Sequence, residues 1–320
     1  MTATPGRDAD RADRPRTIFF GSGAFAVPIL EVVASSPDVR LVAVVSAPDR
    51  PAGRGGRLTS SPVIVRAREL DIGVIQPPRV RAPAAIAEIV GLGAWLGVLA
   101  DYGQIIPADL TSAFPAGILN VHPSLLPRHR GATPVQATIL AGDARAGVTV
   151  IRMDSGLDTG PIVAATGWPL TGTETTPDLE RRAAAEGARL LVSTLSPRLK
   201  GWLDAHDQRA AGVMITRTLH REDGGLDPHR TVTELERQVR AYQPWPGTWF
   251  ETPAGRVMVW SARGDRRLPI AEPGTVTRDG VIVSDGVLIL DEVQLAGGKR
   301  LEWASVLRGH RSVEGSRIPE

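Results

Sequence analysis

The feature that most constrains the fold is the alternation of short apolar runs with helical segments between residues 17 and about 200. The runs TIFF, VRLVAVVSA, GVLAD, GILNVH and VTVIRMD are rich in β-branched residues and have the length of buried strands. Strands that alternate with helices pair in parallel, because each helix carries the chain back across a face of the sheet. The pattern predicts an α/β, Rossmann-like parallel-sheet domain over residues 17–205.

A smaller β-rich module is expected over residues 219–320. Its first helix, in TVTELERQVRAY, is expected to start with a capping box of Thr233 and Glu236, and short strands separated by glycine turns follow from residue 249. This texture is typical of an OB-like β-barrel. The polar segment 206–218 is interpreted as a linker, and Thr176 is expected to be the N-cap of the helix that closes the first domain.

Composition excludes several classes of protein. A chain of 320 residues with 42% apolar and 22% charged residues is typical of a two-domain globular protein. The lack of cysteine excludes disulfides, thiolate metal sites and a cysteine nucleophile. No stretch approaches the roughly 18 uncharged apolar residues that span a membrane. Residues 1–16 lack the apolar core of a signal peptide, so a disordered tail and a cytoplasmic location are expected.

The basic residues leave two interpretations open. The net charge is only +2, but Lys200 and Lys299 are the only lysines among 37 basic residues. Arginine binds phosphate bidentately, which suits a nucleic-acid partner. A preference for arginine can also follow from genomic base composition and then indicates no partner.

The stretch FFGSGAFAVPIL has the G-x-G-x-x-A spacing of a dinucleotide-binding turn at Gly21, Gly23 and Ala26. Such a site also needs an acidic residue at the end of the second strand, about 20 positions later, to hold the ribose. That strand ends at Ser46, and the first acid, Asp49, falls in a loop. We therefore interpret the glycines as a tight turn into a helix and not as an NAD site.

The chemistry concentrates around GILNVHPSLLPRHRG. Asn120 and His122 alternate along a strand and so face the same side. An amide donor beside an imidazole is the pair that acyl-type transfer requires, because one stabilises a developing oxyanion while the other moves a proton. Pro123 and Pro127 stiffen the loop that follows. The alternative is that the two polar residues only finish a strand.

The loop DSGLDTG adds a carboxylate. A calcium-binding EF-hand loop would need glutamate where Ala165 stands, and the zinc pattern H-E-x-x-H is absent. A single loop aspartate is most often a turn residue. Together with Asn120 and His122, however, a carboxylate of this loop, Asp154 or Asp158, completes a set of donor, base and orienting group, because a carboxylate beside an imidazole stabilises its protonated form.

Four stretches carry a family resemblance: PDRPAGRGGRLTSSPV at 48–63, NVHPSLLPRHRGATPVQATILAGD at 120–143, VTVIRMDSGLDTG at 148–160 and RAYQPWPGTWF at 240–250. On these residues the chain resembles the methionyl-tRNA formyltransferases, within the wider group of 10-formyltetrahydrofolate-dependent formyltransferases. The Asn-x-His-Pro-Ser-Leu-Leu-Pro motif is shared by the whole group. The first and last stretches narrow the resemblance to the tRNA enzymes.

The resemblance implies that Asn120, His122 and Asp158 are catalytic. It implies transfer of a formyl group from 10-formyltetrahydrofolate to the amino group of initiator methionyl-tRNA, by a monomer and without a metal. The residues expected to border the folate are Ser124, Leu125, Leu126, Pro127, Tyr102 and Gly103, the last two in the loop 99–107.

Two further surfaces are expected to face the tRNA. Arg50, Arg54 and Arg57 lie among glycines, which suits a loop that orders against phosphates, although a solvated surface loop is the alternative. By analogy with the related glycinamide ribonucleotide enzymes, the turn of Gly21, Ser22, Gly23 and Phe25 is expected to line the acceptor side, at a helix N-terminus that attracts anions.

Three positions depart from the family pattern. Asp101 replaces the usual alanine before Tyr102, His129 replaces an aromatic residue between two arginines, and Thr218 replaces a basic residue, for which Arg217 and Arg221 could compensate. Two rival functions also remain: a formyltransferase for an amino sugar nucleotide or another small amine, and a noncatalytic tRNA-binding protein.

Overall fold

The computed structural model describes residues 14–52, 57–198, 205–266 and 271–318. Most of the predicted N-terminal tail and Arg54 therefore lie outside the described residues. The chain forms two compact units. The first takes residues up to 131, then 146–168 and 180–215, and the second takes 132–145, 169–179 and 216 onward. The division into domains at 17–205 and 219–320, with a linker at 206–218, remains our proposal.

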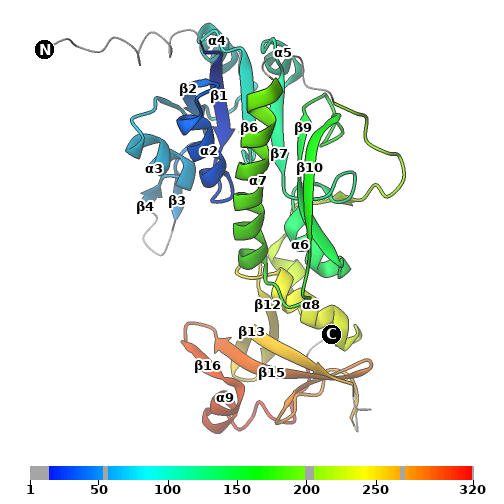
Figure 1. Ribbon diagram of the computed structural model, residues 1–320. Coiled ribbons are helices and arrows are strands. Elements are labelled where there is room, and N and C mark those ends of the chain that lie inside the picture. Colours follow the sequence, from blue (N-terminus) through cyan, green and yellow to red (C-terminus); the bar gives the residue numbers. More distant parts are fainter. Residues whose placement is uncertain (1–13, 53–56, 199–204, 267–270, 319–320) are drawn as a thin grey trace, which may run out of the picture. The chain divides into compact units, whose positions relative to one another are not determined.

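Within the described residues, a seven-stranded sheet forms the centre of the first unit (Figure 1). Its order is β10-β9-β7-β6-β1-β2-β5. The bounds are β1 (Arg16–Gly21), β2 (Arg40–Val45), β5 (Val74–Ile75), β6 (Leu96–Ala100), β7 (Ile118–His122), β9 (Arg145–Arg152) and β10 (Ile162–Pro169). The strands from β5 to β7 are parallel, as the alternating pattern predicts, whereas β9 joins β7 antiparallel.

Helices cover both faces of this sheet. They are α2 (Ala26–Ser35), α3 (Pro62–Glu69), α4 (Pro83–Gly91), α5 (Ala108–Ser112) and α7 (Thr176–Arg198). Ile18 and Phe20 of β1 pack with side chains of α4 and α5, and Phe19 between them points to the opposite face. On that opposite face α7 passes close to β7, since a Cβ on Gly187 would lie 2.9 Å from Val121 Cγ1. The predicted Rossmann-like layering is confirmed.

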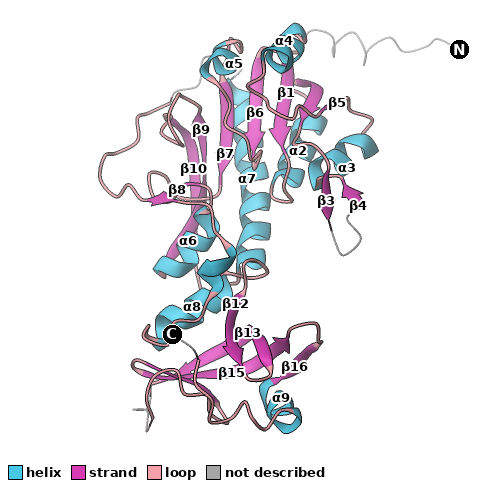
Figure 2. Cartoon of the chain, turned by 180° about the vertical axis from the view of Figure 1, so that it is seen from behind, coloured by secondary structure: helices cyan, strands magenta, loops and turns pink. Residues whose placement is uncertain are grey.

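The second unit contains an antiparallel sheet of order β12-β13-β15-β14, with β16 beside β15 (Figure 2). The bounds are β12 (Thr248–Thr252), β13 (Gly255–Asp265), β14 (Gly280–Val283), β15 (Gly286–Leu295) and β16 (Arg300–Glu302). Its helices are α6 (Pro134–Ala141), the 3-10 helix η1 (Arg221–Gly224), α8 (Val232–Ala241) and α9 (Trp303–Gly309). Phe250, Leu288 and Trp303 pack in one core. This sheet confirms the predicted OB-like module.

Two predicted helix starts are wrong by one or two residues. The capping box of α8 is formed by Thr231 and Glu234 instead of Thr233 and Glu236, because TVTELE contains two overlapping T-x-x-E patterns. The earlier start includes Val232 in the helix and buries it in the core. Thr176 is the first residue of α7 and not its N-cap. Its hydroxyl instead donates to the carbonyl of Ala241, 2.6 Å away.

No helix in the described part of the chain is both long enough and apolar enough to span a bilayer. Among the described residues, no group of three His, Asp or Glu side chains could hold a metal ion. The metal-free reaction stays a prediction.

Candidate active site

Asn120 and His122 lie at the carboxyl end of β7, which is buried along its whole length. Both side chains are almost inaccessible, at 6% and 5% exposed. Asn120 is paired with Leu99 of β6 on one side, and His122 with Thr149 of β9 on the other. Because the strands on both sides are themselves buried, only the loops beyond this edge of the sheet give access to the pair.

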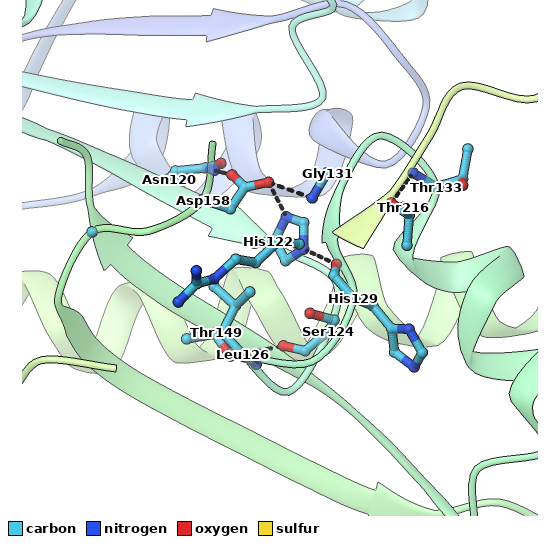
Figure 3. A network of polar contacts seen from close by, with 12 residues as sticks. Asn120, His122, Ser124, Leu126, His129, Gly131, Thr133, Thr149, Asp158 and Thr216 are labelled. Atoms are coloured by element: carbon cyan, nitrogen blue, oxygen red, sulfur yellow. Dashed lines mark hydrogen bonds and ion pairs between the residues drawn. The ribbon is translucent and has the colours of Figure 1, made fainter. Parts of the chain in front are cut away.

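The loop after β9 brings Asp158 to the same place (Figure 3). Asp158 has a positive φ of 52°, which turns its carboxylate toward β7. Asn120 Nδ2 donates to Asp158 Oδ1 at 3.0 Å, and the backbone N–H of Gly131 donates to Oδ2 at 2.8 Å. His122 Nδ1 lies 3.6 Å from the same Oδ2. The structure thus brings together the three residues predicted to be catalytic.

The two ring nitrogens of His122 have different contacts. Its Nε2 lies 2.9 Å from the carbonyl oxygen of His129, an acceptor only, so Nε2 carries a hydrogen. Its Nδ1 lies 3.6 Å from the Asp158 carboxylate, beyond hydrogen-bond distance, so Nδ1 can still contact a substrate oxygen.

Two residues that the sequence did not indicate hold the Asp158 loop in place. Gln208 Nε2 donates to the carbonyl oxygens of Asp158 and Gly160, both at 2.8 Å. Arg130 in turn donates to Gln208 Oε1 from two of its nitrogens. Gln208 falls in the segment predicted as a linker, where no local pattern distinguishes it from any other polar residue.

The loop after His122 is fixed from within. Ser124 Oγ donates to the carbonyl of Arg128 at 2.7 Å. Thr149 Oγ1 donates to the carbonyl of Ser124 at 2.7 Å and accepts from the N–H of Leu126 at 3.2 Å. Ser124 and Leu126 are therefore buried supports, and Leu125 and Pro127 keep exposed surface. Leu125 packs against Gly147 of β9 and Gly167 of β10, and the role of this loop in folate binding stays a prediction.

The loop after β6 also contains both buried and exposed residues. The Tyr102 side chain is buried against Phe20, its hydroxyl has no hydrogen-bond partner in the described part of the chain, and burial raises the pKa of its phenol. Gly103, at φ 79°, has open space where a side chain would stand. Ile105 is 87% exposed, and Leu157, next to Asp158, is 57% exposed. These open and apolar positions fit a flat ligand such as the predicted folate.

Sequence comparisons give the family. The formyl transferase family model matches residues 15–195, and the formyl transferase C-terminal domain model matches residues 218–311. A methionyl-tRNA formyltransferase of Roseiflexus castenholzii is 40% identical over 310 residues, which cover 95% of this chain and 98% of the relative. The corresponding enzyme of Paramagnetospirillum magneticum is 40% identical over 305 residues, 94% of this chain and 99% of the relative. This chain belongs to the methionyl-tRNA formyltransferase family.

Solved structures agree on the fold of this formyltransferase. HypX from Aquifex aeolicus, in complex with tetrahydrofolic acid, has a TM-score of 0.62 at 16% identity, over 96% of this chain and 49% of HypX. An N-formyltransferase from Helicobacter canadensis, in complex with folinic acid and dTDP-3-aminofucose, has a TM-score of 0.62 at 16% identity, over 90% and 100%. At this identity the likeness supports the fold alone.

The glycine turn of the formyltransferase differs from an open anion site. Four amide N–H groups of the turn and of the first turn of α2 already donate: Ser22 and Gly23 to the carbonyl of Asp101, Ala26 to Gly23 and Val27 to Ala24. Phe25, the N-cap of α2, is buried. A Cβ on Gly21 would lie 2.9 Å from the carbonyl of Ala100, so close packing requires glycine there. These contacts leave little support for anion binding at the turn, although its acceptor-side role stays a prediction.

Ser22 connects four segments at the carboxyl edge of the sheet. Its hydroxyl donates to the carbonyl of Tyr102 at 3.1 Å, accepts from the N–H of Ala47 at 3.1 Å and lies 3.2 Å from Ser46 Oγ. Ser46 Oγ lies 2.9 Å from the hydroxyl of Ser61, which caps α3. These three serine hydroxyls hold the loops after β1, β2 and β6 in register.

In the basic segment, β3 (Arg50–Ala52) and β4 (Arg57–Thr59) pair antiparallel and form a β-hairpin. Arg50 is exposed on β3, Arg57 begins β4, and Arg54 lies outside the described residues. At the base of the hairpin Asp49 accepts from Ser60 and from Gln76. The carboxylate that the dinucleotide pattern would have needed is therefore used to fix the hairpin.

Two of the departures from the family pattern, His129 and Thr218, lie in segments with defined local contacts. His129, at φ 58°, contributes its backbone carbonyl to His122 while its ring is buried. Near Thr218, Arg217 forms an ion pair with Asp223, which lowers the pKa of that carboxyl to about 2. Arg217 is thus committed within its own segment and does not simply replace the missing basic residue.

Proposed function

We propose that this chain transfers the formyl group of 10-formyltetrahydrofolate to the free amino group of methionine on initiator methionyl-tRNA. Two facts support this. Relatives that share about two fifths of the sequence along nearly its full length are methionyl-tRNA formyltransferases. The observation that carries the proposal is the buried set of Asn120, His122 and Asp158 at the open edge of the sheet.

The folate supplies a formyl group whose carbonyl carbon the amine attacks, so negative charge develops on the formyl oxygen. Asn120 uses one amide hydrogen toward Asp158, and no described group accepts its second. That N–H and the Nδ1–H of protonated His122 are the donors available to the oxygen. Both are buried, so neither has to be stripped of water during the reaction.

Asp158 accepts the proton that the amine loses on attack. Its carboxylate accepts hydrogen bonds from Asn120 and Gly131 while it faces His122, which fixes its position. It is thus the placed base for the amine, and His122 beside it can return a proton to the departing nitrogen. In the net reaction the amine nitrogen exchanges a proton for the formyl group, and the folate nitrogen exchanges the formyl group for a proton.

The proposed folate contacts come from the loops after β6 and β7. Leu125, Pro127 and Ile105 border the folate, with backbone from Tyr102 and Gly103. Arg50, Arg54 and Arg57 are proposed to contact tRNA phosphates, with the barrel at 219–320 as the second tRNA surface. We also propose that the chain acts as a monomer in the cytoplasm.

The test is a transfer assay with the purified full chain, 10-formyltetrahydrofolate and charged initiator tRNA, with amino sugar nucleotides and other small amines as competing acceptors. We expect an acid-stable formyl group on the methionine of the tRNA and none on the small amines. Transfer to a small amine alone would support the rival small-amine enzyme. Binding of tRNA without any transfer would support the noncatalytic alternative.

A further inference from the structure

Asp101 places a second carboxylate at the edge of the sheet where His122 ends β7. It follows β6 directly, at a positive φ of 45°. β6 pairs with β7 in parallel, with Leu99 opposite Asn120, so Asp101 follows the strand next to the one that carries His122. On the other side, the carbonyl of Asp101 accepts the N–H groups of Ser22 and Gly23.

The carboxylate lies against the glycine turn. A Cβ on Gly23 would stand 1.6 Å from Asp101 Oδ2 and 2.7 Å from its Cγ, so the carboxylate occupies the space that glycine leaves. The side chain forms no hydrogen bond or ion pair within the part of the chain that the structure describes, and the residue remains exposed. Surrounding atoms still desolvate it, which raises the pKa of the carboxyl above its ordinary value. The carboxylate is thus partly desolvated and still accessible to a ligand.

The charge of the ligand follows from the neighbours. The amide N–H groups of the turn are largely used by backbone acceptors, and the carboxylate stands over it, so an anion would be repelled. Asp101 and Asp158 bring two carboxylates to the carboxyl edge of the sheet, Asp101 beside the glycine turn and Asp158 beside His122. This edge of the sheet therefore attracts a cation, and in the proposed reaction the cation is the protonated α-amine.

We propose that Asp101 binds the α-ammonium group of the aminoacyl end of the tRNA and positions it for attack. This inference rests on the proposed function. The ammonium must lose one proton before its nitrogen can attack the formyl carbon, and Asp101 takes that proton and releases it to solvent. The amine nitrogen then adds to the formyl carbon, and the bond from that carbon to the folate nitrogen breaks afterwards. The second amine proton passes to the folate nitrogen by way of Asp158 and His122.

The test compares binding of two tRNAs that differ only at the reacting group. One initiator tRNA carries methionine, and the other carries the α-hydroxy analogue made by deaminating the methionine. Dissociation constants are measured at about pH 6, where the α-amine is protonated. We expect the wild-type chain to bind the amino form about tenfold more tightly, and Asp101→Asn to bind both forms equally.

Asp109→Asn is the matched control, because Asp109 is an exposed aspartate on α5 with the same charge. It should keep the full tenfold difference. In transfer assays Asp101→Asn should raise the KM for charged tRNA about tenfold and leave the KM for the folate unchanged. Discrimination that persists in Asp101→Asn, or is absent in the wild type, would overturn the inference even if the wild type formylates tRNA. Lack of tRNA formylation by the wild type would instead overturn the proposed function.

Discussion

At the level of the single residue, Asp101 should lower stability in exchange for its role. Desolvation raises the pKa of this carboxyl above 3.8, so ionisation costs the folded state more than the unfolded state. The wild type therefore loses stability as the pH rises from about 3.8 through the folded-state pKa, whereas an asparagine does not titrate.

We expect Asp101→Asn to be more stable than the wild type at pH 7 and the difference to disappear as the pH falls toward 3.8. Urea unfolding at a series of pH values measures it. A stability difference that does not change with pH would contradict the desolvation of Asp101.

A substitution at Tyr102 tests whether its phenol is structural or binds the ligand. Its hydroxyl is buried without a partner in the described residues, among apolar side chains. Removing an unsatisfied polar atom from a core is neutral or stabilising, so Tyr102→Phe should gain between zero and about 1 kcal/mol. The KM for the folate should not change, because the phenol is buried in the core and does not reach the surface. A clear rise in that KM would show that the phenol contacts the ligand.

Some site residues could be predicted from the sequence and others could not, for a physical reason. Asn120 and His122 are two residues apart on one strand, and alternation alone puts them on one face. Asp158 needed the resemblance, because its contact with Asn120 spans 38 residues. Gln208 donates to the carbonyl of Asp158, 50 residues away in the sequence, and Arg130 donates to Gln208 across 78 residues. No local pattern contains such contacts.

At the level of the element, the hydroxyls of Ser22, Ser46 and Ser61 link the loops that follow β1, β2 and β6. Ser22→Ala would leave the N–H of Ala47 without its acceptor and the carbonyl of Tyr102 without its donor. We expect a loss of about 1–3 kcal/mol in the free energy of unfolding, measured in urea. Ser35→Ala, on the exposed end of α2, is the control and should stay within about 0.5 kcal/mol. Equal effects of the two changes would argue against the network.

Elements were easier to predict than their ends. The strands of the sheet follow from apolar runs, because strands buried on both faces need no polar side chains. The antiparallel direction of β9 does not, since an apolar run carries no sign of its direction. The sequence offers two threonines as the N-cap of α8. The structure uses Thr231, which places Val232 in the helix and buries it in the core of the second unit.

At the level of the whole molecule, tRNA binding should depend on salt through the hairpin arginines. Each phosphate contact releases counterions, so removing one arginine lowers the slope of log affinity against log salt by about 1. Arg50→Ala and Arg57→Ala should each do this without changing the KM for the folate. Arg81→Ala, an exposed arginine ahead of α4, should keep the wild-type slope. An unchanged slope in the hairpin variants would remove these arginines from the tRNA surface.

The most direct test of the central claim is single-turnover formylation of initiator methionyl-tRNA by the wild type and by Asn120→Ala, His122→Ala and Asp158→Ala. Loss of an oxyanion donor or of a placed proton-transfer group typically costs roughly 10²- to 10⁴-fold in rate. We predict a loss of that size in each variant, with folding and folate binding retained. A near-normal rate in any one of them would contradict the assignment of that residue to the reaction.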